Sequence, residues 1–244
     1  MTAPENKIEV LYEDKNLLVL NKPAGLIVHS DGRTKEKTLA DWLIERYPEI
    51  KNIGEPWQKE TVAIPRPGIV HRLDRETSGA IVIAKNQETY LFLKKQFQER
   101  KVVKKYRAFV YDKLKEKEEV IERPIGKSTK DFRLWSAQRG ARGEMREAIT
   151  SYKVIASNEN FSLVEATPKT GRTHQIRVHF KAINHPVVCD RLYAPRQECA
   201  LGFERLALHS FQIKFVAENG DTIEVEAPYP ADFKKALENF AAAY

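Results

Sequence analysis

Residues 71–78 hold the side chains in this sequence that are most suited to chemistry. Asp74 lies between Arg72 and Arg75 and directly follows the apolar Leu73. A carboxylate can act as a nucleophile or stabilise a developing positive charge, and a nearby arginine favours its ionised form. An aspartate in a charged loop is more commonly a turn residue that pairs with a neighbouring arginine. The residues alone leave both interpretations open.

The element that must position Asp74 is a loop that leads into a buried strand. Residues 80–84 are apolar and rich in β-branched side chains, which is typical of a strand buried on both faces. Gly68 and Gly79 bracket the polar residues and permit tight turns. A loop next to a buried strand presents its side chains from a rigid support. We therefore expect Asp74 to be held in a fixed position.

The composition indicates a globular protein with an anionic partner. The chain has 244 residues, a net charge of +7, 42% hydrophobic and 31% charged residues. This length is sufficient for one large domain or two small ones. No apolar run approaches the roughly 20 residues that span a membrane, and the first residues lack the apolar core of a signal peptide. We expect a cytoplasmic protein without a membrane partner.

Cysteine and histidine spacing gives no sign of a metal site. Cys189 and Cys199 have neither zinc-ribbon nor CxxC spacing, so we expect two free thiols rather than a disulfide. His174 and His179 are five positions apart, whereas two ligands on one helix face are four apart. We expect no structural metal.

Hydrophobic periodicity predicts an α+β fold with a large mixed, mostly antiparallel sheet. Residues 51–67 contain three prolines and are expected to form an irregular connection. Thr38 and Asn86 are expected helix caps. The predicted strands are 8–12, 17–20, 80–84, 102–110, 148–156, 161–166, 206–216 and 222–226, and the predicted helices are 38–47, 86–100, 232–242 and one that begins near residue 173.

Two stretches combine many basic residues with few acids, which favours contact with RNA phosphates. An alternative for the second is a hairpin whose aromatic rings pack in the core. The first stretch consists of Lys94, Lys95, Arg100, Lys101, Lys104, Lys105 and Arg107. The second interleaves Lys127, Lys130, Arg133, Arg139, Arg142 and Arg146 with Phe132 and Trp135, an arrangement on which bases can stack.

The string Gly68-Ile-Val-His-Arg-Leu-Asp74-x-x-Thr77-Ser-Gly79 resembles the signature of the RluA family of RNA pseudouridine synthases. The resemblance implies one pseudouridine synthase catalytic domain over residues 1–244, without a separate N-terminal RNA-binding domain. It implies that a uridine of ribosomal or transfer RNA is converted to pseudouridine without a metal or other cofactor. Further stretches that resemble the family in the same order are 21–29, 104–110, 166–180, 185–193 and 205–209.

The resemblance also implies roles for single residues. Asp74 matches the catalytic aspartate, Arg177 the arginine that pairs with it, and Tyr106 a tyrosine that stacks on the uracil. Whether Asp74 attacks C1′, attacks the base or removes a ribose proton stays open. Arg72 matches a residue that helps to fill the space left by the flipped base, and Ile176 is expected beside the base. The implied substrate-binding residues are His71, Arg72, Leu73, Thr77, Arg172, His174 and Ile176.

The sequence departs from the family pattern at two positions. Asn184 and Cys189 stand where glycine is common in the family. Both belong to a turn rather than to the carboxylate motif, so we expect local structural differences and the same reaction.

Two other classes of function are consistent with parts of the sequence. The basic stretches alone would suit a catalytically silent RNA-binding protein of the same fold. A hydrolase that uses Asp74 with His71 is a weaker alternative, because no nucleophile–base–orienter set accompanies the pair. We expect a monomer in each case.

Overall fold

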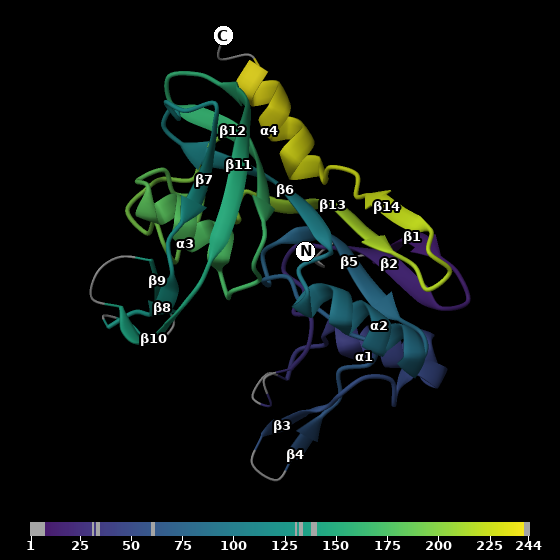
Figure 1. The fold of residues 1–244 in the computed structure, drawn as a ribbon. Coiled ribbons are helices and arrows are strands. Elements are labelled where there is room, and N and C mark those ends of the chain that lie inside the picture. Colours follow the sequence, from purple (N-terminus) through teal and green to yellow (C-terminus); the bar gives the residue numbers. More distant parts are fainter. Residues whose placement is uncertain are drawn as a thin grey trace. The chain divides into compact units, whose positions relative to one another are not determined.

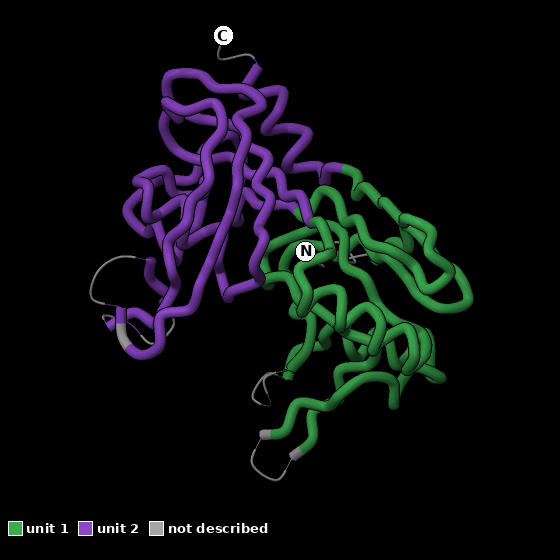
Figure 2. The backbone as a smooth tube through the Cα atoms, viewed as in Figure 1, with its two compact units in different colours: residues 1–103, 210–228 green, residues 104–209, 229–244 purple. Residues whose placement is uncertain are grey.

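The structure is a computed structural model that describes residues 8–30, 32, 35–59, 62–129, 131, 134–137 and 141–241. The chain forms two compact units (Figure 2). Unit 1 consists of residues 1–103 and 210–228, and unit 2 consists of residues 104–209 and 229–244.

Unit 1 is built on a sheet with the predicted buried strand in its interior (Figure 1). Strand β5 (Ser78–Ala84) is buried along its whole length. It pairs antiparallel with β2 (Leu17–Lys22), which pairs antiparallel with β1 (Glu9–Glu13). On its other side β5 neighbours β13 (Leu208–Val216), which forms a hairpin with β14 (Thr222–Glu226).

Two helices and a short 3-10 helix complete the ordered core of unit 1. Helix α1 (Leu39–Arg46) begins at Thr38 and Asp41, which form a capping box, and 3-10 helix η1 (Pro48–Ile50) follows it. Helix α2 (Gln87–Gln98) begins at Asn86, whose side chain accepts a hydrogen bond from the Thr89 N–H. Both predicted caps are confirmed. The apolar face of α2 packs with residues of β2, β5 and β13 in one hydrophobic cluster.

Unit 2 contains a second run of antiparallel strands, in the order β6 (Val103–Tyr111), β12 (Phe161–Pro168), β11 (Ile149–Ser157) and β7 (Glu118–Glu122). Helix α3 (Gln175–Ala182) follows β12, and helix α4 (Ala231–Ala241) ends the described chain. Phe109, Phe203, Phe233 and Phe240 pack their rings together. The short strands β8 (Ile125–Lys127), β9 (Trp135–Ser136) and β10 (Arg142–Arg146) form a separate small sheet.

The predicted α+β class is confirmed, with large, mostly antiparallel pairing. The prediction for residues 51–67 is wrong in one respect, because β3 (Trp57–Lys59) and β4 (Val62–Ile64) form an antiparallel hairpin there (Figure 1). Three-residue strands are too short to give a recognisable alternation in a sequence. Among the described residues, no helix is long and apolar enough to cross a membrane.

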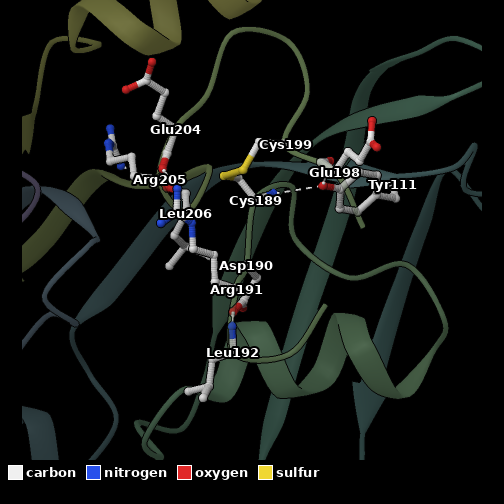
Figure 3. Close-up of a disulfide and its surroundings, with 10 residues drawn as sticks. All are labelled: Tyr111, Cys189, Asp190, Arg191, Leu192, Glu198, Cys199, Glu204, Arg205 and Leu206. Carbon is white, nitrogen blue, oxygen red and sulfur yellow. Dashed lines mark hydrogen bonds between the residues drawn. A yellow bond between two sulfur atoms is a disulfide. The ribbon is translucent and has the colours of Figure 1, made fainter. Parts of the chain in front are cut away.

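The expectation of two free thiols is wrong, because Cys189 and Cys199 form a disulfide (Figure 3). The chain turns back between them and brings their Cα atoms to 4.5 Å. Tyr111 ties the two ends together, since its hydroxyl donates to the Glu198 carbonyl at 2.6 Å and accepts from the Cys189 N–H at 3.1 Å. This approach depends on a distant tyrosine, so the spacing of the cysteines could not reveal it.

Both departures from the family pattern lie in the left-handed backbone region. Asn184 has φ +66° and Cys189 has φ +57°. Glycine adopts this conformation without steric cost, and asparagine tolerates it better than most residues. The backbone therefore explains why glycine suits these turns. At Cys189, the disulfide offers a compensation for the steric cost of a positive φ.

Candidate active site

The backbone around Asp74 is fixed by hydrogen bonds within unit 1. Thr77 N–H donates to the Asp74 carbonyl at 3.1 Å and closes a turn, and Gly25 N–H donates to the Arg75 carbonyl at 2.9 Å. Asp74 itself is half-buried, next to the buried Leu73. The turn therefore presents the carboxylate from a rigid support, as predicted.

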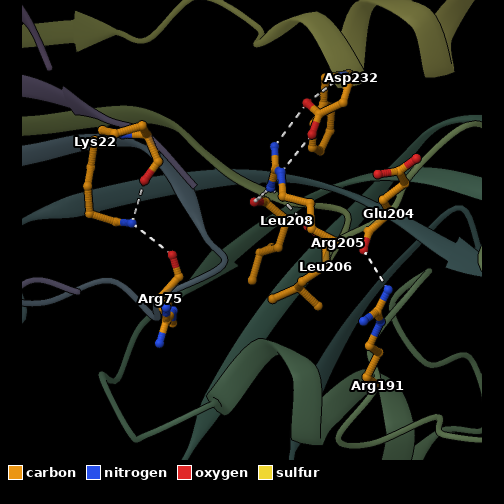
Figure 4. A network of polar contacts seen from close by, with 10 residues as sticks. Lys22, Arg75, Arg191, Glu204, Arg205, Leu206, Leu208 and Asp232 are labelled. Carbon is orange, nitrogen blue, oxygen red and sulfur yellow. Dashed lines mark hydrogen bonds and ion pairs between the residues drawn. The ribbon is translucent and has the colours of Figure 1, made fainter. Parts of the chain in front are cut away.

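Lys22 is the residue that joins this turn to the loop after β2 (Figure 4). Its side chain is fully buried, and its ammonium donates to the carbonyls of Pro23 at 2.8 Å, Leu26 at 2.9 Å and Arg75 at 3.1 Å. A buried ammonium is costly unless its donors are satisfied, and three carbonyls match its three donors. Residues 21–29 were among the stretches that resemble the family, but nothing in the sequence indicated this role for Lys22.

The arginines that flank Asp74 differ in their surroundings. Arg75 forms an ion pair with Glu36, with Nη2 and Oε2 2.6 Å apart. Arg72 is exposed, as suits a residue expected to enter the RNA. The alternative that Arg75 serves to pair with Asp74 is not supported, because its guanidinium binds Glu36 on the loop before α1.

His71 has a structural environment. Its Nε2 accepts a hydrogen bond from the Val82 N–H at 3.0 Å, and its ring stacks on Phe97 with centroids 4.7 Å apart. An Nε2 that accepts a backbone hydrogen bond has its lone pair occupied and cannot also serve as a general base. The hydrolase alternative therefore loses support, and a direct role of His71 in binding substrate remains a prediction.

The other two predicted residues of this motif are buried. Leu73 is 3% exposed and Thr77 is 2% exposed. The Thr77 hydroxyl is buried without a hydrogen-bond partner within the described part of the chain. Leu73 contributes packing beneath the turn, whereas Thr77 retains a polar atom close to Asp74 in the sequence.

Gly79 allows β13 to approach the start of β5. It has φ +109°, and a Cβ built on it would lie 2.2 Å from the Ser210 carbonyl oxygen. The Ser210 hydroxyl donates to the Ala80 carbonyl at 3.0 Å. Any side chain at position 79 would therefore push the two strands apart immediately after the Asp74 turn.

In unit 2, Arg177 on α3 forms a buried bidentate ion pair with Asp190. Its Nε and Nη2 each lie 2.8 Å from an oxygen of that carboxylate. Asp190 Oδ1 also accepts from the N–H groups of Leu192 and Tyr193, both at 3.1 Å. The Arg177 guanidinium lies over the Tyr193 ring, 5.0 Å from its centroid. Arg177 thus belongs to a fixed, buried network rather than to a solvated face of α3.

Asp190 is a residue of this network that sequence reasoning did not single out. It is 1% exposed and holds two of the five N–H groups of Arg177. Residues 185–193 were among the stretches that resemble the family, which was the available signal. Nothing in the sequence indicated that Asp190 would form an ion pair with Arg177, thirteen positions earlier on α3.

His174 and Tyr193 continue the same network. His174 precedes α3 with a left-handed backbone, φ +55°, and its Nδ1 lies 2.9 Å from the Tyr193 hydroxyl. That hydroxyl accepts from the Trp135 N–H at 3.1 Å. His174 is therefore held by the network that contacts Arg177, which supports the prediction that both belong to one site.

Arg172 and Ile176 occupy the start of α3. Arg172 Nε donates to the Glu147 carbonyl at 2.9 Å, so this side chain is anchored to the segment before β11. Ile176 is 6% exposed. Most of the Ile176 side chain is covered by protein, so only its exposed edge could contact the base. That contact stays a prediction.

Tyr106 lies on β6, where it opposes Ala166 of β12, and it is 9% exposed. Lys104 is two residues earlier and therefore shares its face of the strand. Burial lowers the pKa of Lys104 to about 8. The face that carries Tyr106 thus also carries a partly desolvated basic group.

The first basic stretch is less positive than the sequence indicates. Lys94 pairs with Glu55 at 2.5 Å, and Lys101 pairs with Glu99 at 2.6 Å. In unit 2, Arg107 forms an ion pair with Glu165. Glu55 and Glu165 lie outside residues 94–107, so a count of charges within that window overlooks them.

The second basic stretch is described only in part. Lys127 lies 5.8 Å from the Trp135 ring centroid, and Arg146 pairs with Glu144. Trp135 packs against the small cluster of Ile125 and its neighbours, as the alternative of a core-facing aromatic predicts. Lys130, Phe132, Arg133, Arg139 and the side chain of Arg142 lie outside the described residues.

The family model described as RNA pseudouridylate synthase matches residues 16–182. The chain belongs to this family. The matched residues include Asp74, Tyr106 and Arg177. The synthase is 36% identical over 238 residues to an uncharacterized RNA pseudouridine synthase of Synechocystis sp. (strain ATCC 27184 / PCC 6803 / Kazusa), which covers 97% of this chain and 70% of that protein.

Two further comparisons agree with this family. A ribosomal large subunit pseudouridine synthase D of Neisseria meningitidis serogroup B is 38% identical to the synthase over 241 residues, covering 94% of this chain and 60% of that protein. The solved structure of human RNA Pseudouridylate Synthase Domain Containing 4 has a TM-score of 0.74 and 27% identity, covering 95% of this chain and 92% of that chain. The predicted RluA-type membership and RNA pseudouridine synthase activity are confirmed, and RNA is the partner.

The predicted residues fall into two groups, each assembled by its own unit. Unit 1 brings together His71, Arg72, Leu73, Asp74 and Thr77 on one turn, and unit 2 brings Arg172, His174, Ile176 and Arg177 together at α3, with Tyr106 on β6. The ion pair between Asp74 and Arg177 stays a prediction.

Proposed function

We propose that this RNA pseudouridine synthase isomerises a uridine of large-subunit ribosomal RNA, with Asp74 as its essential carboxylate. The observation that carries the role of Asp74 is the rigid turn, which Lys22 and Gly25 both anchor through the Arg75 carbonyl. A catalytic group must be held within a fraction of an ångström of its productive position. The ribosomal substrate is supported by relatives named ribosomal large subunit pseudouridine synthase D, from Neisseria meningitidis and Zymomonas mobilis.

The reaction needs no exchange of atoms with a second substrate. The bond between uracil N1 and ribose C1′ breaks, the base turns, and a bond forms between C5 and C1′. The proton lost from C5 is balanced by the proton gained at N1. A carboxylate at Asp74 would stabilise or trap the sugar, or the base, while the two are separated.

Arg177 and Tyr106 have supporting roles in this proposal. Arg177 would pair with Asp74 and keep it ionised in a site closed to water. Asp190 orients the Arg177 guanidinium, which limits the positions that its remaining N–H groups can reach. Tyr106, a largely buried residue of β6, would stack on the uracil and move a proton at C5.

The target uridine must leave its stack before it can react. N1 and C1′ are covered by neighbouring bases in a helix, and unstacking costs a few kcal/mol. Arg72, which is exposed beside the Asp74 turn, would occupy the space that the base leaves. Phosphate contacts offset the cost of unstacking.

The proposal extends to the organisation of the molecule. Residues 1–244 would act as one catalytic domain that works as a cytoplasmic monomer without a cofactor. Transfer RNA is the alternative substrate, since it also offers looped-out uridines.

Mapping of pseudouridine in total RNA, from cells with and without the gene, tests this proposal. A chemical adduct that stops reverse transcription marks each pseudouridine. We expect loss of one or a few sites in large-subunit ribosomal RNA. Loss confined to transfer RNA would show that transfer RNA, rather than ribosomal RNA, is the substrate. Loss of no site, together with inactivity of the purified protein on unmodified transcripts, would contradict the activity.

A further inference from the structure

Arg66 lies directly before the catalytic motif, on a backbone that the structure fixes firmly. The Ile69 N–H donates to the Arg66 carbonyl at 3.2 Å and closes a turn through Pro67 and Gly68. Gly68 has φ +62°, its N–H donates to the Ile53 carbonyl, and its carbonyl accepts from the Ala84 N–H. Arg66 is therefore anchored to the same strand, β5, that supports the Asp74 turn.

The side chain of Arg66 packs on Trp57 of the β3–β4 hairpin. The guanidinium carbon lies 5.3 Å from the Trp57 ring centroid, which is the distance of a cation–π contact. Trp57 remains 37% exposed, so part of its ring is available to a ligand. A large aromatic side chain exposed next to an arginine is a surface on which a base can stack.

The surroundings of Arg66 differ from those of Arg75. Its Nε is buried without a hydrogen-bond partner among the described residues. Burial lowers the pKa of Arg66, and the positive charge of Arg72 lowers it further. Among the described residues, the groups that shift this pKa include no carboxylate, whereas Arg75 binds Glu36.

The positive charge of Arg72 acts on Arg66, and the Arg66 guanidinium packs on an exposed aromatic ring, so an anion that contacts Arg66 would offset the unfavourable interaction between the two arginines. Arg72 belongs to the motif expected to contact the substrate, and its charge acts on Arg66, so the anion at Arg66 would be a phosphate of that RNA. An aromatic ring beside the phosphate accommodates the adjoining base.

We propose that Arg66 and Trp57 bind the RNA strand that flanks the target uridine, with a backbone phosphate on the Arg66 guanidinium and a neighbouring base on Trp57. This inference rests on the proposed function, since it places the site beside Asp74. It makes the β3–β4 hairpin a part of the substrate-binding surface rather than an irregular connection.

Binding of a labelled oligouridine of about 12 nucleotides, measured over a range of salt concentrations, tests the inference. Arg66→Gln should raise Kd about tenfold at low salt and reduce the magnitude of the salt slope by about 0.7, the value for one phosphate contact of a single strand. Arg66→Lys keeps the charge and should retain the slope while losing part of the affinity. Trp57→Ala should weaken binding about tenfold through lost stacking, with the slope unchanged.

Two controls separate this site from general electrostatics. Lys113→Gln removes one positive charge at a residue that pairs with Glu159 in unit 2, and it should leave Kd and slope unchanged. An oligouridine with neutral methylphosphonate linkages should bind wild type and Arg66→Gln equally. Folding of each variant is checked by its thermal transition. If Arg66→Gln is unfolded, the affinity of Arg66→Lys is compared with that of wild type instead.

The inference would be overturned if wild type bound no oligouridine at low salt, or if folded Arg66→Gln matched wild type in both Kd and slope. For an unfolded Arg66→Gln, an Arg66→Lys protein with wild-type affinity would overturn it. These outcomes are distinct from failure of the proposed function. A wild type that isomerises RNA with binding independent of Arg66 contradicts only the inference, and one that binds through Arg66 without turnover contradicts only the proposed function.

Discussion

At the scale of single residues, Asp190 determines how Arg177 is presented. The pair is buried on both sides, and Asp190 is itself oriented by two backbone N–H groups. Removal of one partner of a buried pair leaves an uncompensated charge and costs about 3–5 kcal/mol. The Arg177 guanidinium would then lose its fixed orientation as well as its counter-ion.

We predict that Asp190→Asn lowers the free energy of unfolding by about 3 kcal/mol and kcat by about a hundredfold. Asp232→Asn is a matched control, because Asp232 forms a similar bidentate pair with Arg205 in the same unit and neither residue is a predicted site residue (Figure 4). The control should lose stability and retain kcat. Urea unfolding and single-turnover assays measure the two quantities, and a wild-type kcat in Asp190→Asn would refute the positioning role.

His179 makes stability depend on pH. It is fully buried, its Nδ1 lies 2.9 Å from the Thr150 hydroxyl and its Nε2 lies 2.9 Å from the Arg123 carbonyl. Burial lowers the pKa of His179 below the ordinary value of 6.5. As pH falls below 6.5, the unfolded chain binds a proton that the folded state excludes, so the free energy of unfolding decreases.

Urea unfolding at pH values above and below 6.5 checks this expectation. Wild type should lose stability on the acidic side, and His179→Gln should lose less because one titrating group is gone. Equal pH dependence in the two proteins would show that other groups govern the acid transition.

At the scale of elements, the close approach of β13 to β5 sets the position of the Asp74 turn. We predict that Gly79→Ala costs more than about 3 kcal/mol, because it adds a clash with the Ser210 backbone to the strain of a positive φ. Gly220→Ala is the matched control, since Gly220 has φ +89° and no atom near its Cβ position, and it should cost about 1 kcal/mol. Equal losses in the two variants, measured by urea unfolding, would contradict the importance of this approach.

The turn after α3 depends on the disulfide between Cys189 and Cys199. Closure of a loop with a sequence separation of 10 should contribute about 2–3 kcal/mol to stability. We predict that a reducing agent lowers the unfolding free energy by this amount, and that it has no effect on a Cys189→Ala, Cys199→Ala protein. An equal free energy with and without reductant in wild type would contradict the prediction.

At the scale of the whole molecule, the features predicted from the sequence were those determined locally. The Thr38 and Asn86 caps and the adjacent strands predicted at 206–216 and 222–226 each depend on a few neighbouring residues. The Asp74 motif was recognisable because its residues are contiguous.

The features that the sequence did not reveal depend on residues far apart in the chain. Glu55 neutralises Lys94, Asp190 binds Arg177, and Tyr111 brings the two cysteines together. The buried Nε of Arg66, which has no hydrogen-bond partner in the described part of the chain, is likewise a property of the folded chain. Only the folded chain decides which charges remain available for RNA.

The central claim is that Asp74 performs the isomerisation, and the most direct test is turnover by Asp74→Asn beside wild type. Purified proteins are incubated with unmodified large-subunit ribosomal RNA transcripts, and pseudouridine is mapped by adduct-dependent stops of reverse transcription. We predict that the variant loses at least about a thousandfold in rate while it binds RNA with nearly unchanged Kd. Turnover within about tenfold of wild type would contradict the assignment of Asp74.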